Sequence, residues 1–213
     1  MSQSSGIAVI VDLVGSRVQP DRVEAQHQLV SALADVNHTV DALQPLAPTI
    51  GDECQGAYPD LPSALRASLL LRLLLPGALD CRFGIGAGTW RSVGSSDYGP
   101  MQDGPGWWAA RDAIVEAKSR ETRRNRTLRS WYVVAEEHLD DAPSPALVNA
   151  LLLCRDEIVT GMGDRSRRLL LGMLRGSTQV ELAEAEGISQ SAVSQNLRRS
   201  GALTLVAADE VLA

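Results

Sequence analysis

The stretch that decides the fold is Gly6-Ile7-Ala8-Val9-Ile10-Val11-Asp12-Leu13. Its apolar residues follow one another without the alternation of a half-exposed strand, and Gly15 ends the run. Such a run is typical of a strand buried in the middle of a sheet. We therefore predict a central strand over residues 6–13.

Further strands and helices are expected around this strand. Helical spacing of apolar residues predicts helices, and short β-rich runs bounded by turn residues predict strands. Helices are expected at about 20–43, 61–75 and 107–120, and strands on both sides of Gly51-Asp52 within 47–58, at 81–90 and at 131–135. Residues 94–106, rich in Gly, Ser, Asp and Pro, are expected to form a loop. The resulting order, β-α-ββ-α-β-α-β, indicates an α+β sheet with its helices on one face.

A linker is expected at 140–145, where Asp-Asp-Ala-Pro-Ser-Pro continues neither a helix nor a strand. Beyond it, helical patterns cover residues 146–161, 164–175, 178–186 and 189–200. For residues 202–213 a wing, a helix and a dimer arm all stay open. We predict two domains, an α+β domain over 1–140 and a small all-α domain over 146–213.

The composition indicates an ordinary soluble globular protein, with 213 residues, 45% hydrophobic and 22% charged. The net charge of −6 argues against a protein that coats nucleic acid through bulk charge. The charge is uneven, because residues 164–200 hold six Arg and four acidic residues, a net +2, which leaves −8 for the rest of the chain. A weakly basic tail on an acidic body is typical of a small DNA-binding module on a larger sensor.

The cysteines and the N-terminus indicate a cytoplasmic protein. Cys54, Cys81 and Cys154 are isolated, so we expect buried free thiols in a reducing compartment. The N-terminus lacks the basic region of a signal peptide. The longest apolar stretch, 69–75, contains Arg72 and is too short to span a bilayer, so no membrane contact is expected.

The strongest local motif covers residues 179–197, Gln-Val-Glu-Leu-Ala-Glu-Ala-Glu-Gly-Ile-Ser-Gln-Ser-Ala-Val-Ser-Gln-Asn-Leu. Two short helices that cross through a tight turn need a small residue at their contact, here Ala183, and a turn residue, here Gly187. Ser189 is suited to cap the second helix, and Val193 and Leu197 place apolar side chains on its inner face. The pattern resembles helix-turn-helix domains of bacterial regulators and sigma-like factors over roughly residues 164–200.

The outer face of the second helix predicts contact with double-stranded DNA. Ser and Gln hydrogen-bond to base edges, and Arg meets phosphate or guanine. The residues expected to contact DNA are Ser189, Gln190, Ser191, Ser194, Gln195, Arg198 and Arg199. The alternative is a helical hairpin used only for dimerisation, which has no need of an uncharged polar face followed by arginines.

Two carboxylates are expected to meet at one edge of the sheet. Asp12 ends the buried strand, and Asp52 lies at the tip of the hairpin. Hard divalent cations such as Mg²⁺ bind carboxylates of this kind, with phosphate oxygens completing the shell. The structural alternatives are a cap of the strand-to-loop turn for Asp12 and a turn position for Asp52. Of Glu53 and Gln55, which follow, we expect one to face the site and the other to face solvent. The glycine-rich strand at 82–88 has so little side-chain bulk that a ligand or a helix can approach it closely.

These segments together resemble the class III nucleotidyl cyclases and, more distantly, the GGDEF diguanylate cyclases. The similar motifs are Val11-Asp12-Leu13-Val14-Gly15, Thr49-Ile50-Gly51-Asp52 and Ala109-Ala110-Arg111. The resemblance implies a ferredoxin-like palm domain with metal ligands at Asp12 and Asp52, phosphate binding at Arg111 and Gly51 beside the ligand. A closer similarity is to the SatD family, through Gly-Asp-Glu-x-Gln-Gly at 51–56, Arg-Phe-Gly-Ile-Gly-x-Gly at 82–88 and Asp-Gly-Pro…Ala-Arg at 103–111.

Two positions depart from the cyclase pattern. Cyclases place a base-selecting Lys four residues before the hairpin Asp, where this chain has Pro48. They also place an Asn four residues before the catalytic Arg, where this chain has Trp107. The resemblance therefore implies a ligand-binding domain without an assigned catalytic residue. Trp107 is either a core residue or stacks on a nucleobase of the ligand.

Three functions stay open at this point. The first is a homodimeric transcriptional regulator whose cyclase-like domain binds a nucleotide-type ligand with Mg²⁺. The second is a metal-dependent nucleotidyl cyclase or transferase with an auxiliary DNA-binding tail, and the third is a scaffold whose first domain only dimerises.

A basic run is expected to form a solvated face, with DNA phosphates or nucleotide phosphates as the alternative partners. Its residues are Lys118, Arg120, Arg123, Arg124, Arg126 and Arg129.

Overall fold

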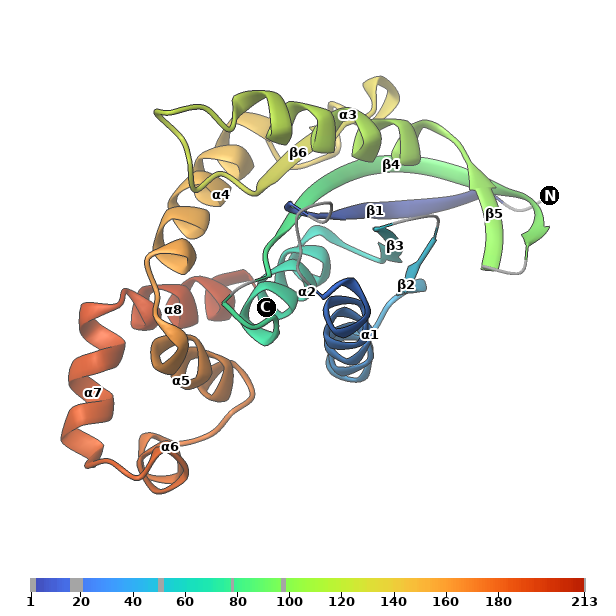
Figure 1. The fold of residues 1–213 in the computed structure, drawn as a ribbon. Helices are drawn as coiled ribbons and strands as arrows, with labels where there is room; N and C mark the ends of the chain where they lie inside the picture. The colour runs from blue at the N-terminus through green and yellow to red at the C-terminus, as the bar shows by residue number, and fades with distance from the viewer. Residues whose placement is uncertain (1–2, 16–20, 50–51, 78, 97–98, 213) are drawn as a thin grey trace.

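Six strands form one sheet in the computed structural model, which describes residues 3–15, 21–49, 52–77, 79–96 and 99–212 (Figure 1). The strands are β1 (Gln3–Leu13), β2 (Gln44–Pro48), β3 (Glu53–Tyr58), β4 (Cys81–Ser96), β5 (Gly99–Asp103) and β6 (Ser130–Val134). Neighbours follow the order β2-β3-β1-β4-β5, all antiparallel, and β6 pairs with β4 in parallel. β1 is therefore an interior strand, as its apolar sequence predicts.

The first six elements form a βαββαβ unit. α1 (Arg22–Thr39) connects β1 to β2, and α2 (Leu61–Leu74) connects β3 to β4. Within this unit the strands lie in the order β4-β1-β3-β2, which is the arrangement of a ferredoxin-like sheet. The α+β prediction is thus confirmed.

Helices cover both faces of the sheet (Figure 1). Val9 and Val11 belong to the core cluster that contains residues of α1 and α2, whereas Ala8 and Ile10 pack with residues of α3 (Pro105–Arg120). The expectation that the helices lie on one face holds for α1 and α2 and is wrong for α3. A strand that is apolar at every position needs cover on both sides, and α3 supplies the second cover.

Glycines in β4 allow α3 to lie directly on the sheet. A Cβ atom at Gly84 would lie 2.1 Å from the carbonyl oxygen of Ala110, and one at Gly86 would lie 2.2 Å from the Ala110 nitrogen. Any side chain at these positions would push α3 away from β4. Of the two neighbours predicted for this strand, a ligand or a helix, the structure has the helix.

β4 is longer than the sequence predicts. It continues to Ser96 and pairs with β5, so the loop prediction for residues 94–106 is wrong over most of its length. The ribbon is held by backbone pairing, for example of Ser92 with Gln102. Backbone hydrogen bonds need no apolar pattern, and this Gly- and Pro-rich segment therefore shows no strand periodicity.

The C-terminal helices end within one residue of the predicted positions. They are α4 (Pro145–Thr160), α5 (Asp164–Leu174), α6 (Gln179–Glu186) and α7 (Gln190–Arg199), and the open stretch after them is a helix, α8 (Ala202–Leu212). α6 and α7 lie farthest from the sheet (Figure 1). Among the residues described, no helix is both long and apolar enough to cross a membrane.

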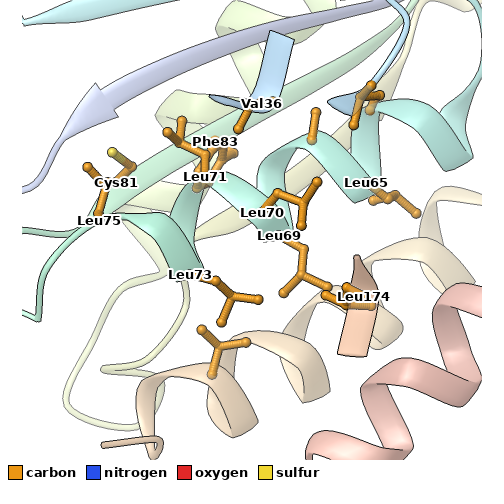
Figure 2. Packing of buried hydrophobic residues seen from close by; sticks show 14 of the residues in the cluster. Val36, Leu65, Leu69, Leu70, Leu71, Leu73, Leu75, Cys81, Phe83 and Leu174 are labelled. Carbon is orange, nitrogen blue, oxygen red and sulfur yellow. The ribbon is translucent and has the colours of Figure 1, made fainter. Parts of the chain in front are cut away.

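α2 is the element shared by the sheet and the C-terminal helices. It is buried on nearly every side, as expected for a helix that is apolar all round. Figure 2 shows Leu71 near Phe83 of the sheet, and Leu69 and Leu73 on the side that faces Leu174 of α5. One apolar cluster therefore extends from β1 to α8. The division into two separate domains, 1–140 and 146–213, stays a prediction.

A buried ion-pair cluster joins α2, α4 and the start of β6. Asp156 is fully buried, and one of its oxygens accepts from the backbone nitrogens of Arg129 and Ser130 at 2.7 Å each. Its other oxygen accepts from Nη1 of Arg72 at 3.0 Å. The expectation of a solvated basic face fails for Arg129, which is buried and donates from Nε to Asp80 at 2.6 Å. The cluster fixes the helices after the linker to the rest of the core.

Two of the three cysteines are buried as expected. Cys54 and Cys81 face the core, and burial raises the pKa of the Cys54 thiol to about 12. Cys154 is exposed on α4, so the expectation of a buried thiol is wrong there. Cys154 lies on the outer side of α4, whose opposite side packs against β6 and α2. The apolar pattern of α4 does not show which side this single residue occupies.

Candidate functional site

The candidate site lies where β1 ends beside the start of β3, on the face covered by α3. Asp12 is directly opposite Glu53 in the β1–β3 pair and opposite Arg82 in the β1–β4 pair. It shares the α3 side of β1 with Ile10, because residues two apart in a strand face the same way. Arg111 reaches the site from the middle of α3. Four elements distant in sequence therefore supply its charged groups.

The two predicted metal ligands, Asp12 and Asp52, lie close enough to interact. Burial raises the pKa of Asp12 above its ordinary value, and repulsion and a side-chain hydrogen bond from Asp52 raise it further. Arg82, with Nη1 at 3.8 Å from Oδ2 of Asp12, acts in the opposite direction. Two neighbouring carboxylates that resist ionising together are stabilised by a bound cation.

Glu53 forms a two-pronged ion pair with Arg111. Nη1 and Nη2 of Arg111 donate to Oε2 and Oε1 of Glu53 at 2.5 and 2.7 Å, and Nε2 of Gln55 donates to Oε1 at 2.9 Å. Burial acts to raise the pKa of Glu53, but these donors outweigh it and the pKa is lowered. The bonds to Glu53 raise the pKa of Arg111. The expectation that only one of Glu53 and Gln55 faces the site is wrong, since the two are bonded on the same side of β3.

The carboxylates fit Mg²⁺. In the part of the chain that the structure describes, no three His, Cys, Asp or Glu side chains are grouped so as to hold a metal ion. Mg²⁺ does not require such a group, because it is commonly held by one or two carboxylates together with phosphate oxygens and water. Asp12 and Asp52 supply two carboxylates, and their role as metal ligands stays a prediction.

A second candidate surface is built by α6, α7 and the turn between them. Thr178 and Glu181 form a capping box at the start of α6, each satisfying a backbone nitrogen of the other residue. Gly187 ends α6 in the left-handed conformation, at φ 63°, and the chain turns there. Ser189 caps α7 by accepting from the Ala192 nitrogen at 3.2 Å. Each turn and cap position predicted from the sequence has its expected local role.

α7 separates an apolar inner face from a polar outer face. Val193 and Leu197 are fully buried. Of the residues predicted to contact DNA, Ser194 is half-buried and the others are exposed, namely Ser189, Gln190, Ser191, Gln195, Arg198 and Arg199. The Gln190 side chain donates to Gln179 of α6 at 3.1 Å. The outer face thus presents uncharged hydrogen-bonding groups first and two cations at its end.

The comparison with protein families identifies the chain. Residues 6–209 match the SatD family. The chain belongs to the SatD family. The match extends past the sheet and its helices to α8, and so the SatD resemblance given by the three motifs is confirmed.

Individual solved structures resemble this SatD-family chain over part of its length. No curated protein matches it. Two solved structures similar to it are of a bacterial light-regulated adenylyl cyclase. One has 12% identity and a TM-score of 0.46, and covers 56% of this chain and 73% of the other. The second has 14% identity and a TM-score of 0.44, and covers 56% of this chain and 41% of the other.

Pro48 and Trp107, the two positions at which this SatD-family chain departs from the cyclase pattern, differ from each other in their surroundings. Pro48 ends β2 opposite Cys54. Trp107 is buried, with its ring centroid 6.1 Å from that of Trp90 and its Nε1 donating to Gln102 at 3.1 Å. It is therefore a core residue, and its contact with a ligand stays a prediction. Gly51, the remaining residue predicted to bind ligand, lies outside the described residues.

Sequence reasoning missed two cationic neighbours of Asp12. Arg82 was recognised only as part of the glycine-rich strand, and Lys118 only as part of the basic run, yet both act electrostatically on Asp12. The spacing held a usable signal for Lys118, which lies seven residues, or two turns, after Arg111 on the same side of α3. For Arg82 the signal was its even spacing from Gly84, the strand position that faces α3.

Proposed function

We propose that this chain is a cytoplasmic, DNA-binding transcriptional regulator that acts as a homodimer. It contacts double-stranded DNA through α7 and binds a nucleotide-type phosphorylated ligand with Mg²⁺ at the end of β1 and β3. The observation that carries the proposal is the outer face of α7, which is polar, exposed and ends in two arginines, while the inner face is fixed by two buried side chains.

The chemistry of α7 supports DNA binding by a recognition helix. Gln190 and Gln195 have the donor and acceptor groups that read base edges, and Arg198 and Arg199 carry the charge that meets phosphates. The helix is held rigidly by α6, since the turn between them is only three residues long and both helices are capped. One such helix makes too few contacts for specific binding, which is the reason for proposing a dimer with two half-sites.

The charges at the sheet edge support a site for a phosphorylated ligand. Arg111 has the planar, two-pronged donor geometry that suits phosphate, and its side chain is 49% exposed. Asp12 and Asp52 would hold Mg²⁺ beside that phosphate, and the cation, when bound, neutralises phosphate charge. Arg82 and Lys118 attract the Asp12 carboxylate and oppose its repulsion by Asp52.

A continuous series of ion pairs connects this site to the C-terminal helices. Adjacent charged groups lie between 2.5 and 3.8 Å apart throughout the series. The series runs through Asp12, Arg82, Glu121, Arg129, Asp80, Arg72 and Asp156. A ligand that changes the charge at Asp12 therefore acts on a network that also fixes α4, which supports regulation of DNA binding by the ligand.

The test is a gel-shift series with fragments of genomic DNA. We expect sequence-selective binding by the wild-type chain, selective loss of specific binding in Gln190→Ala with Ser194→Ala, and weaker binding to every fragment in Arg198→Ala. Arg22→Ala, which removes an exposed arginine from α1, is the matched control and should bind like the wild type. Binding without any preference among the fragments would contradict the proposal.

A second candidate function is a metal-dependent nucleotidyl transferase with an auxiliary DNA-binding tail. The observation that favours it is the proximity of Asp12 and Asp52, together with Arg111 across the same site. It predicts turnover of a nucleoside triphosphate that Asp12→Ala abolishes. Pro48 and the buried Trp107 stand where cyclases have their polar purine-binding and catalytic side chains, and they favour the regulator instead.

A further inference from the structure

While Glu53 holds Arg111, a phosphate cannot bind the guanidinium edge formed by Nη1 and Nη2. The outer nitrogens of the guanidinium already donate to both oxygens of the Glu53 carboxylate, at 2.5 and 2.7 Å. Carboxylate and phosphate are bound by arginine through the same two-pronged geometry, so the two anions compete for one edge of the guanidinium. Glu53 therefore occupies the position that a phosphate of the ligand would take.

The pair is accessible enough for this exchange. The Arg111 side chain is 49% exposed and that of Glu53 is 23% exposed. Ion pairs that retain this much contact with water are weak, so an anion in solvent can reach Arg111 and compete with the carboxylate. The buried pair of Arg72 with Asp156, by contrast, offers no such access, since both side chains are at most 1% exposed.

Once displaced, Glu53 needs a new partner for its charge. It lies opposite Asp12 in the strand pair and directly follows Asp52 in the chain. Its release from Arg111 therefore adds a third carboxylate charge to two that already repel each other. A divalent cation at Asp12 and Asp52 would offset that repulsion more strongly than the single charges of Arg82 and Lys118 do.

We propose that Glu53 makes the binding of phosphate at Arg111 conditional on a divalent cation. When the ligand enters, Glu53 exchanges Arg111 for the cation and the ligand's phosphate takes its place on the guanidinium. No covalent bond changes in this exchange. The ligand class is therefore a phosphate or polyphosphate that arrives with its divalent cation, and the free anion is excluded. This inference rests on the proposed ligand site, whose regulation it describes.

The experiment is a calorimetric titration of the full chain with inorganic pyrophosphate, with and without Mg²⁺. We expect the wild type to bind only with Mg²⁺. Glu53→Gln should bind pyrophosphate without Mg²⁺ at least about tenfold more tightly than the wild type, because an amide competes poorly with phosphate for a guanidinium. Its dependence on Mg²⁺ should shrink accordingly. Glu116→Gln, which removes a charge paired with Arg120 elsewhere on α3, is the control and should behave as the wild type.

The outcomes separate the exchange from the site itself. Equal affinities of the wild type and Glu53→Gln without Mg²⁺ would overturn the exchange while leaving the site in place. Wild-type binding that needs no Mg²⁺ would do the same. If neither chain binds pyrophosphate under any condition, the proposed ligand site is wrong and the exchange falls with it. Glu53→Asp, which keeps the charge on a shorter side chain, should fall between the two and serves if Glu53→Gln does not fold.

Discussion

Two arginine–carboxylate clusters of this protein differ in how completely they are closed. One oxygen of Asp156 accepts from two backbone nitrogens and the other from the side chains of Arg72 and Ser130, and water has no access to the carboxylate. The open cluster around Asp12 and Glu53 is partly exposed. Glu53 is paired with Arg111, whereas the pKa of Asp12 is raised by burial and by Asp52. The first cluster joins elements of the core, and the second retains groups that can still exchange partners.

The difference shows how the same side chains serve structure or binding. A buried carboxylate without its partners is costly, so a cluster such as that of Asp156 persists only when it is complete. A half-exposed cluster contributes little to stability, and selection for stability alone gives no reason to keep an unfavourable carboxylate there. Burial of the partners, and not the residue types, therefore separates the two clusters.

Asp156→Ala tests the closed cluster and should have the largest effect. Removing the carboxylate leaves Nη1 of the buried Arg72 without its acceptor, and it leaves two backbone nitrogens without an acceptor. Breaking a buried pair in this way costs about 3–5 kcal/mol of the free energy of unfolding. Urea unfolding of the variant beside Asp112→Ala, which removes an exposed carboxylate of α3, measures the difference. A loss equal to that of the control would show that the cluster contributes nothing.

Gly86→Ala should have the next largest effect, because it forces α3 off the sheet. The new Cβ would lie 2.2 Å from the Ala110 nitrogen, and overpacking of this kind costs about 3 kcal/mol. Since Arg111 follows Ala110, the variant should also weaken pyrophosphate binding. Gly94→Ala is the matched control, because its Cβ would meet only the Met101 sulfur at 3.8 Å. Equal unfolding midpoints for both variants would contradict direct contact between α3 and β4.

The two carboxylates of the open cluster should respond to neutralisation with opposite signs. The folded-state pKa of Asp12 is raised, so its stabilising contribution is present below its unfolded pKa and is lost as pH rises through the folded one. Asp12→Asn should therefore stabilise the protein at neutral pH. The folded-state pKa of Glu53 is lowered, so its contribution is present above its unfolded pKa and is lost as pH falls through the folded one. Glu53→Gln should accordingly destabilise the protein at neutral pH.

Both changes should stay within about 1 kcal/mol, because water screens the cluster. Thermal unfolding at a series of pH values from neutral downward measures them, and each difference from the wild type should shrink as the pH falls and the carboxyl becomes protonated in both states. Destabilisation by Asp12→Asn at neutral pH would mean that Asp12 and Arg82 form a structural ion pair. Asp12 would then have the same kind of role as Asp156.

The sequence predicts those parts of the fold that depend on contacts between residues near one another in the chain. The helices of the C-terminal region and the turn at Gly187 are local features, set by apolar spacing and by caps within a few residues, and they were predicted within one residue. β1 was predicted for a similar reason, since its apolar run is continuous. The hairpin of β4 and β5 was missed because backbone pairing leaves no periodic trace in a Gly-rich segment.

The partners within the candidate site depend on contacts between distant segments. Asp12 and Asp52 were expected to meet because strand ends share an edge, but the hold of Glu53 on Arg111 joins positions 58 residues apart. The same applies to Arg129, whose buried side chain pairs with Asp80 and Glu121, 49 and 8 residues before it in the chain. Composition marked it as one member of a basic run, and nothing local distinguishes it from the exposed arginines beside it.

Arg198→Ala should have the smallest effect on stability and an effect on DNA binding alone. Its side chain is exposed at the end of α7, so its loss should leave the unfolding midpoint unchanged. If it meets a phosphate, affinity for every DNA sequence falls, and the slope of log affinity against log salt concentration decreases by about 1. Binding measured over a range of salt concentrations gives that slope. An unchanged slope with altered sequence preference would mean that Arg198 contacts a base, and an unchanged slope and affinity would remove α7 from the interface. The exposed charge of Arg198 is therefore expected to affect binding of a partner. The half-buried pair of Glu53 with Arg111 is expected to affect binding of ions, and the buried charge of Asp156 is expected to affect the stability of the fold.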